Sequence, residues 1–167
     1  MKAIFVLILF FSLFINCYSQ TAEEYFDKGN AKYDLQDYEG AISDFNKVIE
    51  INPNSAEAYY SRGCAKDELQ DHRGAILDFT KTIEINPNAA EAYYNRGIAK
   101  DDLQDHSGAI SDCNKAIEIN PDFAKAYNNR GFAKINLGQK DSGCLDLSKA
   151  GELGHSQDYE AIKDFCN

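Results

Sequence analysis

His72 and His106 are the residues of this chain that come nearest to parts of a reactive site, because an imidazole can carry a proton or bind a metal ion. Each follows an aspartate, Asp71 or Asp105, and the two histidines are 34 positions apart. Tyr38 stands at the same place one interval earlier, which indicates a packing role at a turn between helices. One imidazole beside one carboxylate also gives too few ligands for a metal ion. We therefore predict no catalytic and no metal-binding residue here.

The sequence has none of the common motifs for enzymatic chemistry. It contains no phosphate-binding loop, no glycine-rich dinucleotide fingerprint and no nucleophile elbow. No two cysteines have the spacing of a zinc site. Acidic residues are frequent, but they recur on a repeated surface rather than in a closed pocket. We predict a protein that is not an enzyme and uses no cofactor.

Composition and charge narrow the class of partner. The chain has 167 residues and a formal net charge of −10, and 44% of its residues are hydrophobic. That hydrophobic share excludes a disordered tail. A chain this acidic lacks the basic footprint that nucleic-acid binding requires, and its charge disfavours adsorption to anionic lipid surfaces. We expect a protein or peptide partner, and the sequence leaves the oligomeric state open.

Residues 1–19 have the pattern of a secretory signal peptide. Lys2 supplies a positive start, and residues 3–15 are apolar apart from one serine. This run of 13 residues is shorter than the ~20 that a membrane-spanning helix needs. The small side chains of Cys17 and Ser19 suit cleavage after Ser19, with cleavage after Gln20 as the alternative. We expect a secreted, periplasmic or envelope protein with no membrane span after cleavage.

Two other fates of this segment stay open at the level of the sequence. The segment could remain uncleaved as a membrane anchor, although its apolar run is short. Cys17 stands just after the apolar run, where bacterial lipoproteins are acylated, although residues 14–16 differ from the small residues usual at such sites. Acylation at Cys17 would anchor the protein to a membrane.

The rest of the chain is organised by a repeat of 34 residues. Glycines, tyrosines and prolines fall into register at this interval: Gly29, Gly63, Gly97 and Gly131; Tyr25, Tyr59, Tyr93 and Tyr127; and Pro53, Pro87 and Pro121. A fixed period of about 20–50 residues is typical of repeat proteins, in which each unit packs on its neighbours. We divide residues 20–155 into four repeats, 22–55, 56–89, 90–123 and 124–155, and number positions from the first residue of each repeat.

Each repeat is predicted to form two α-helices. The first helix begins near position 1 and ends around Leu35 in the first repeat, where a Gln-Asp turn follows. The second helix has apolar residues at spacings of three and four, as in Ala41, Phe45 and Val48. An Asn-Pro pair ends it, because the residue before a proline is pushed out of helical geometry. No segment alternates as a strand does, so the fold class is all-α.

The repeats resemble the tetratricopeptide repeat (TPR) family. The pattern of that family has an aromatic residue at position 4, a small residue at 8, alanine at 20, an aromatic residue at 24 and proline at 32. The second repeat matches at Tyr59, Gly63, Ala75, Phe79 and Pro87. The third repeat has Cys113 at position 24, and the fourth has Gly143 and Leu147 and lacks the proline.

The resemblance implies a right-handed α-solenoid of helix–turn–helix units. Residues 156–167 are expected to form a C-terminal capping helix, because a solenoid needs a terminal element with a polar outer face. The recurrent glycine, alanine and aromatic residues of the pattern are expected to pack between helices and to have no site role. Proteins of this family bind peptides on the inner face of the first helices.

On that resemblance, positions near 2, 5, 6, 9, 12 and 13 are candidates for a peptide-binding groove. The candidates are Phe26, Asn30, Glu57, Tyr60, Asp67, Tyr94, Asn95, Asp101, Asn128 and Phe132. Aromatic faces beside carboxylates suit Arg or Lys side chains, so we expect a partner with basic and apolar segments. Some members clamp a C-terminal carboxylate with basic residues, but repeats one to three have no Lys or Arg at these positions. The alternative is an ordinary solvated face.

Charged residues recur at two positions that should face each other across the helix pair. Position 7 is Lys28, Arg62, Arg96 or Arg130, and position 23 is Asp44, Asp78, Asp112 or Asp146. We predict ion pairs such as Arg62 with Asp78, or Arg62 with Asp44 of the preceding repeat, because Arg can bind a carboxylate through two hydrogen bonds. The alternative is that the two rows are separate solvated faces.

Cys144 and Cys166 are centred on residue 155, where we expect a turn between two antiparallel helices. They should therefore lie opposite each other, and an exported protein meets an oxidising compartment. We predict a Cys144–Cys166 disulfide that stabilises the cap by ~3 kcal/mol. Cys64 and Cys113 fall on different helices of different repeats, and we expect both to be free thiols.

Together these patterns predict a non-catalytic scaffold or adaptor that binds a partner peptide or protein in the inner groove. A second possibility is a structural subunit anchored in the cell envelope. Such a subunit would contact its partner through the outer face or the cap and leave the groove empty.

Overall fold

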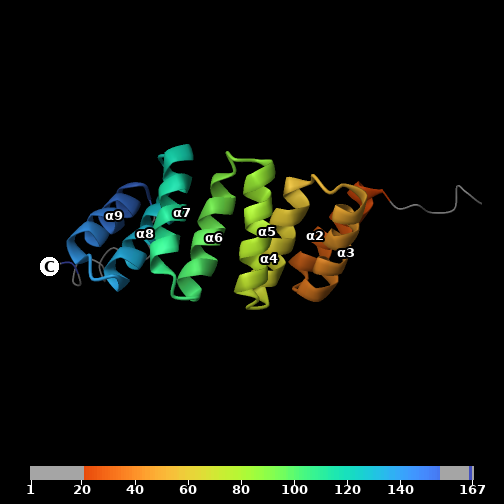
Figure 1. The fold of residues 1–167 in the computed structure, drawn as a ribbon, viewed down its shortest axis with the longest axis horizontal. Helices are drawn as coiled ribbons and strands as arrows, with labels where there is room; N and C mark the ends of the chain where they lie inside the picture. Colours follow the sequence, from red (N-terminus) through yellow and green to blue (C-terminus); the bar gives the residue numbers. More distant parts are fainter. Residues whose placement is uncertain (1–20, 155–165, 167) are drawn as a thin grey trace, which may run out of the picture.

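The computed structural model describes residues 21–154 and residue 166, and this part of the chain contains helices and no strand. The eight helices are α2 (Ala22–Asp34), α3 (Tyr38–Ile51), α4 (Ala56–Glu68), α5 (His72–Ile85), α6 (Ala90–Asp102), α7 (His106–Ile119), α8 (Ala124–Asn136) and α9 (Lys140–Glu152). They follow one another in a single row (Figure 1). The predictions for residues 1–19 and for a capping helix over 156–167 fall outside the described residues, apart from Cys166.

The repeat interval fixes where the helices begin. The even-numbered helices all start at position 1 and the odd-numbered helices all start at position 17. Asp37, Asp71 and Asp105 cap α3, α5 and α7, and each side chain accepts a hydrogen bond from a glycine N–H three residues later. Such caps satisfy backbone donors that have no partner inside the helix. Asp71 and Asp105 therefore act as helix caps and do not pair with the adjacent histidines.

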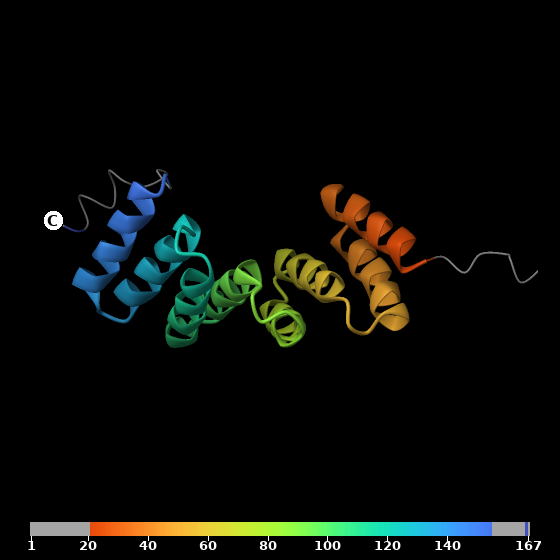
Figure 2. The same ribbon diagram turned by 90° about the horizontal axis from the view of Figure 1, so that it is seen from above.

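The helix pairs stack into a bent row, an α-solenoid. Helices within a pair pack together, and the second helix of each pair packs on the first helix of the next pair. Seen from above, both ends of the row lie on the same side of its middle, with α4 and α6 on the inner side of the bend and α5 and α7 on the outer side (Figure 2). The all-α solenoid expected from the sequence is confirmed. None of the helices in the described part combines the length and apolar character needed to cross a membrane.

Close approach of the two helices in a pair depends on glycine at position 8. Phe79 is fully buried between α4 and α5, and a Cβ atom added to Gly63 would lie 2.8 Å from its ring. Cys113 replaces the aromatic residue in the third repeat, and there a Cβ on Gly97 would lie 3.4 Å from the nearest atoms. The small thiol thus leaves room that the phenyl ring does not.

Buried ion pairs join the same two helices. Arg62 donates to both carboxylate oxygens of Asp78, with Nε–Oδ2 at 2.8 Å and Nη2–Oδ1 at 2.5 Å. Its third nitrogen, Nη1, donates to Oδ1 of Asn46 in the preceding repeat at 2.6 Å. Lys66 places Nζ 2.7 Å from Asp78 Oδ2. The same arrangement of Arg, Lys and Asp recurs at Arg96, Lys100 and Asp112, and at Arg130, Lys134 and Asp146.

The predicted Arg–Asp pairing is confirmed within each of repeats two to four. The alternative pairing of Arg62 with Asp44 is wrong, because Asn46 is the residue of the preceding repeat that Arg62 reaches. The first repeat differs as well. Lys28 lies over the Tyr25 ring, 5.9 Å from its centroid. Lys32 forms the ion pair with Asp44 instead, with Nζ 2.7 Å from Oδ2. An ammonium group lacks the planar fork with which a guanidinium binds both oxygens of one carboxylate.

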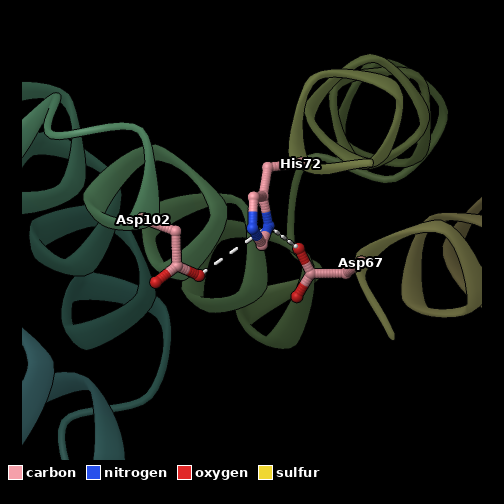
Figure 3. Close-up of side chains that lie close together, drawn as sticks. All are labelled: Asp67, His72 and Asp102. Carbon is pink, nitrogen blue, oxygen red and sulfur yellow. Dashed lines mark hydrogen bonds and ion pairs between the residues drawn. The ribbon is translucent and has the colours of Figure 1, made fainter. Parts of the chain in front are cut away.

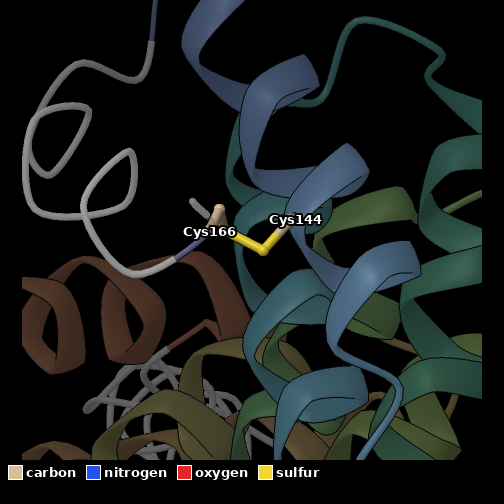
Figure 4. The surroundings of a disulfide bond; sticks show 2 residues. All are labelled: Cys144 and Cys166. Atoms are coloured by element: carbon tan, nitrogen blue, oxygen red, sulfur yellow. A yellow bond between two sulfur atoms is a disulfide. The ribbon is translucent and has the colours of Figure 1, made fainter.

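Cys144 on α9 and Cys166 are joined in the structure by a disulfide, with their Cα atoms 5.8 Å apart (Figure 4). That Cα separation lies within the range that a disulfide accepts without backbone movement. Cys64 is half-buried and Cys113 is buried, and both are free thiols as expected.

Substitution of the position-8 glycines should test how far the aromatic residue sets the helix spacing. We expect Gly63→Ala to lower the free energy of unfolding by about 1–3 kcal/mol, because the added methyl overpacks a site closed by Phe79. Gly97→Ala is the matched control, and it should cost less than about 1 kcal/mol because Cys113 leaves space. Urea unfolding followed by circular dichroism measures both values, and equal losses would show that ring contact does not decide the spacing.

A double-mutant cycle should show that the buried ion pairs couple strongly. Arg62→Gln and Asp78→Asn should give a coupling energy of about 1–3 kcal/mol, because both groups are in one hydrogen-bonded network with side-chain exposures of 17% and 5%. The exposed pair Lys47–Glu50 is the control, and its coupling should be under about 0.5 kcal/mol. Similar couplings for the two pairs would remove the argument that burial makes the Arg62–Asp78 pair special.

Candidate functional site

The candidate site is the inner face of α2, α4 and α6, where position 5 carries an aromatic residue. Phe26, Tyr60 and Tyr94 are each half-buried there. Phe26 and Tyr60 rest on the buried rings of position 24, with ring centroids 5.7 Å from Phe45 and 5.8 Å from Phe79. Each ring is therefore held by the helix pair below it and offers its other side to the inner face.

Repeat three lacks a position-24 ring, and its inner aromatic residue finds another partner. Tyr94 packs against Phe123, with ring centroids 5.0 Å apart. Phe123 is the N-cap residue of α8, at a place where the two preceding repeats have Ser55 and Ala89. Phe123 was not among the predicted site residues. The sequence does contain an indication of its role, because the third repeat has Cys113 in place of the aromatic residue at position 24 and gains Phe123 at position 34.

Three hollows lie side by side along this face, and Tyr60 lines all of them. The first, of about 370 Å³, is also lined by Phe26, Glu57 and Glu91. The second, of about 300 Å³, is lined by residues including Asn30 and Cys64. The third, of about 390 Å³, is lined by Glu91, Tyr94, Asn95, Phe123 and Lys125. We call this surface the inner groove.

Hydrogen bonds across the repeat boundary hold Tyr60 in place. Asn95 Nδ2 on α6 lies 2.8 Å from Tyr60 Oη and 3.8 Å from Cys64 Sγ. Burial raises the pKa of the Tyr60 hydroxyl and raises the pKa of the Cys64 thiol to about 11. Since the thiolate is the reactive form of cysteine, Cys64 is protonated at neutral pH and contributes contact surface rather than nucleophilic chemistry.

The ten predicted groove residues separate into two groups. Six of them line the three hollows: Phe26, Asn30, Glu57, Tyr60, Tyr94 and Asn95. The other four do not line these hollows: Asp67, Asp101, Asn128 and Phe132. Phe132 is 40% exposed on α8, and Asp67 and Asp101 are engaged by histidines.

His72 lies between two aspartates at the end of the inner helices (Figure 3). Its Nδ1 is 2.8 Å from Oδ1 of Asp67 at the end of α4 and 3.8 Å from Oδ2 of Asp102 at the end of α6. His106 makes the corresponding contact with Asp101 at 2.6 Å. The histidines do occupy a turn between helices, but their carboxylate partners are not the adjacent residues that the sequence offered.

The inner groove is acidic because most basic side chains of the first helices form ion pairs with buried aspartates instead of facing the groove. Glu57 and Glu91 are exposed at its edge. The arginines and most lysines of the first helices bind the buried aspartates of the second helices. Lys125, which lines the third hollow, brings positive charge only at the fourth repeat.

Comparison with known proteins agrees with this architecture. Family models described as tetratricopeptide repeat match residues 56–89, 90–123 and 113–144, and one described as TPR repeat matches residues 29–66. The chain belongs to the tetratricopeptide repeat family. A comparison with curated protein sequences gave no match.

Solved structures of TPR proteins superpose on most of the chain. A crystal structure of MamA is 30% identical, with a TM-score of 0.77 over 81% of this chain and 80% of that one. A MamA structure from Desulfovibrio magneticus RS-1 is 27% identical, with a TM-score of 0.75 over 82% and 77%. The first TPR of Spaghetti (RPAP3), bound to the HSP90 peptide SRMEEVD, is 26% identical, with a TM-score of 0.70 over 72% of this chain and 96% of that one.

Proposed function

We propose that this TPR protein is a non-catalytic scaffold that binds an extended segment of another protein in the inner groove. The observation that carries the proposal is the position of Tyr60, which lines three adjoining hollows and is fixed by Asn95. A preorganised aromatic side chain is a typical anchor of a protein interface, because little conformational entropy is lost when a partner packs on it. The peptide complex of the related RPAP3 domain supports the same use of this fold.

The chemistry of the groove favours a partner segment with basic and apolar side chains. Aromatic faces at Phe26, Tyr60 and Tyr94 alternate with the exposed carboxylates of Glu57 and Glu91. Arg or Lys side chains can pair with the carboxylates and stack on the rings. The HSP90 peptide SRMEEVD held by the RPAP3 domain is acidic, and a peptide of that charge would be repelled by repeats one to three of this chain.

We also propose that the protein is exported, on the support of the signal-like segment 1–19 and of the cysteine pair. Export accounts for Cys144 and Cys166 lying at disulfide distance, since disulfides persist in oxidising compartments. Cleavage after Ser19, acylation at Cys17 and retention as an anchor are the alternatives for that segment. Mass spectrometry of the N-terminus of the native protein separates them.

Crosslinking in the native host, followed by affinity measurements with the captured partner, tests the groove. Tyr60→Ala should weaken binding by about 2 kcal/mol, or about 30-fold in Kd, as expected for a central aromatic anchor. Glu57→Lys with Glu91→Lys should weaken it further in low salt, and because both residues are exposed these changes leave the fold intact.

The matched control is Leu77→Ala on α5, a helix of the outer side, where Leu77 is 71% exposed. It should leave binding unchanged. Loss of the partner with Leu77→Ala, but not with the groove variants, would instead support a structural subunit that uses its outer face.

Thiol counting tests the disulfide that accompanies export. In protein isolated from its native compartment and denatured without reductant, alkylation should label Cys64 and Cys113 and leave Cys144 and Cys166 unlabelled. Prior reduction should expose all four to the reagent, and a Cys144→Ser variant should expose Cys166 without reduction. Labelling of all four residues before reduction would contradict the disulfide.

A further inference from the structure

Asp67, His72 and Asp102 form a cluster of potential metal ligands at the turn between α4 and α5. The three side chains come from α4, α5 and α6, and they point toward one another (Figure 3). We propose that they bind one divalent transition-metal ion, such as Zn²⁺, and that this ion links repeats two and three. The proposal is independent of the partner assigned to the inner groove.

The distances fit a single ion. One atom from each residue lies within 4.8 Å of the other two, and His72 Nδ1 is 2.8 Å from Asp67 and 3.8 Å from Asp102. Zinc bonds to nitrogen and oxygen are about 2.0–2.2 Å long, so neighbouring ligands in a tetrahedral site are separated by roughly 3.3–3.6 Å. The observed separations bracket that value.

Two of the ligands are already held in place. Asp67 and His72 flank the short turn between α4 and α5, and the side chain of Asp71 fixes the start of α5 by accepting the Gly74 N–H at 2.9 Å. Asp102 is the adjustable member, because its side chain is 50% exposed at the end of α6. A small rotamer shift of Asp102 would close the longer gap without disturbing the core.

The donor set selects the class of ion. Two carboxylates and an imidazole neutralise a divalent charge, and the imidazole nitrogen favours Zn²⁺ and its neighbours over Mg²⁺ and Ca²⁺, which prefer oxygen. Three protein ligands leave a coordination position for water or for a side chain of a bound protein.

The repeats provide an internal control. His106 contacts Asp101 at 2.6 Å one repeat later in the chain, but Asn136 stands where the preceding site has Asp102. In the first repeat, Tyr33 and Tyr38 take the places of Asp67 and His72. Among the described residues, the complete set of three ligands therefore forms between repeats two and three.

Calorimetric titration of the purified protein with ZnCl₂ tests the proposal. We expect one saturable site, and His72→Ala should weaken it by at least about tenfold, since even outer-shell partners of a metal site cost that much. Asp102→Asn, which reproduces the third-repeat arrangement at an exposed position, should weaken it similarly without affecting the fold. His106→Ala should bind Zn²⁺ as the wild type does, and Mg²⁺ should not compete.

A thermal melt gives a second readout that titration alone does not. Zn²⁺ should raise the melting temperature of the wild type and of His106→Ala, because it bridges two repeats, and at the same concentration it should raise that of Asp102→Asn less, because binding there is weaker. Absence of saturable Zn²⁺ binding would overturn the proposal. Equal Zn²⁺ affinity in the wild type and in Asp102→Asn would overturn it as well.

Discussion

The structure depends on keeping a carboxylate buried in each helix pair. Asp78 and Asp112 are each 3% exposed, and a charge in such a place is tolerated only when paired and hydrogen-bonded. The planar guanidinium of Arg62 satisfies two requirements at once, because it binds both oxygens of Asp78 and reaches Asn46 in the preceding repeat. One side chain thus fixes the register within a repeat and between repeats, which apolar packing alone would specify less sharply.

That constraint also shapes the surface. Arg and Lys at positions 7 and 11 form ion pairs with the buried aspartates. The positive charges of the first helices of repeats two and three are therefore neutralised inside the helix pairs. The carboxylates of Glu57 and Glu91 then dominate the inner groove, with aromatic rings between them. The acidic character of the inner groove is in this sense a by-product of how the solenoid is stabilised.

Periodicity made most of the fold predictable, because helix starts, turns and the Arg–Asp pairs are local to one repeat or repeat every 34 residues. Prediction from periodicity failed for contacts between adjacent repeats whose residues are not the same. In the sequence, the carboxylate beside His72 is that of Asp71, but Asp71 caps α5. The carboxylates that His72 contacts are those of Asp67, in the last turn of α4, and Asp102, in the next repeat. Phe123 was missed because its contact with Tyr94 compensates for a ring lost at Cys113.

Function in a repeat protein should be sought where an otherwise conserved pattern of repeats within one chain is broken. Positions that are identical in every repeat serve the contacts that every repeat must make, and Gly63 is of that kind. Tyr60 is different, because its hydroxyl accepts a hydrogen bond from Asn95 of the next repeat. The corresponding contact does not form elsewhere in the described repeats: Phe26 has no hydroxyl, and the buried amide nitrogen of Asn129 has no hydrogen-bond partner. Asp102 is different in the same way, since Asn136 replaces it one repeat later. Tyr60 and Asp102 both contact residues across the junction of repeats two and three, in the middle of the solenoid, where a partner spanning the inner groove would make its central contacts.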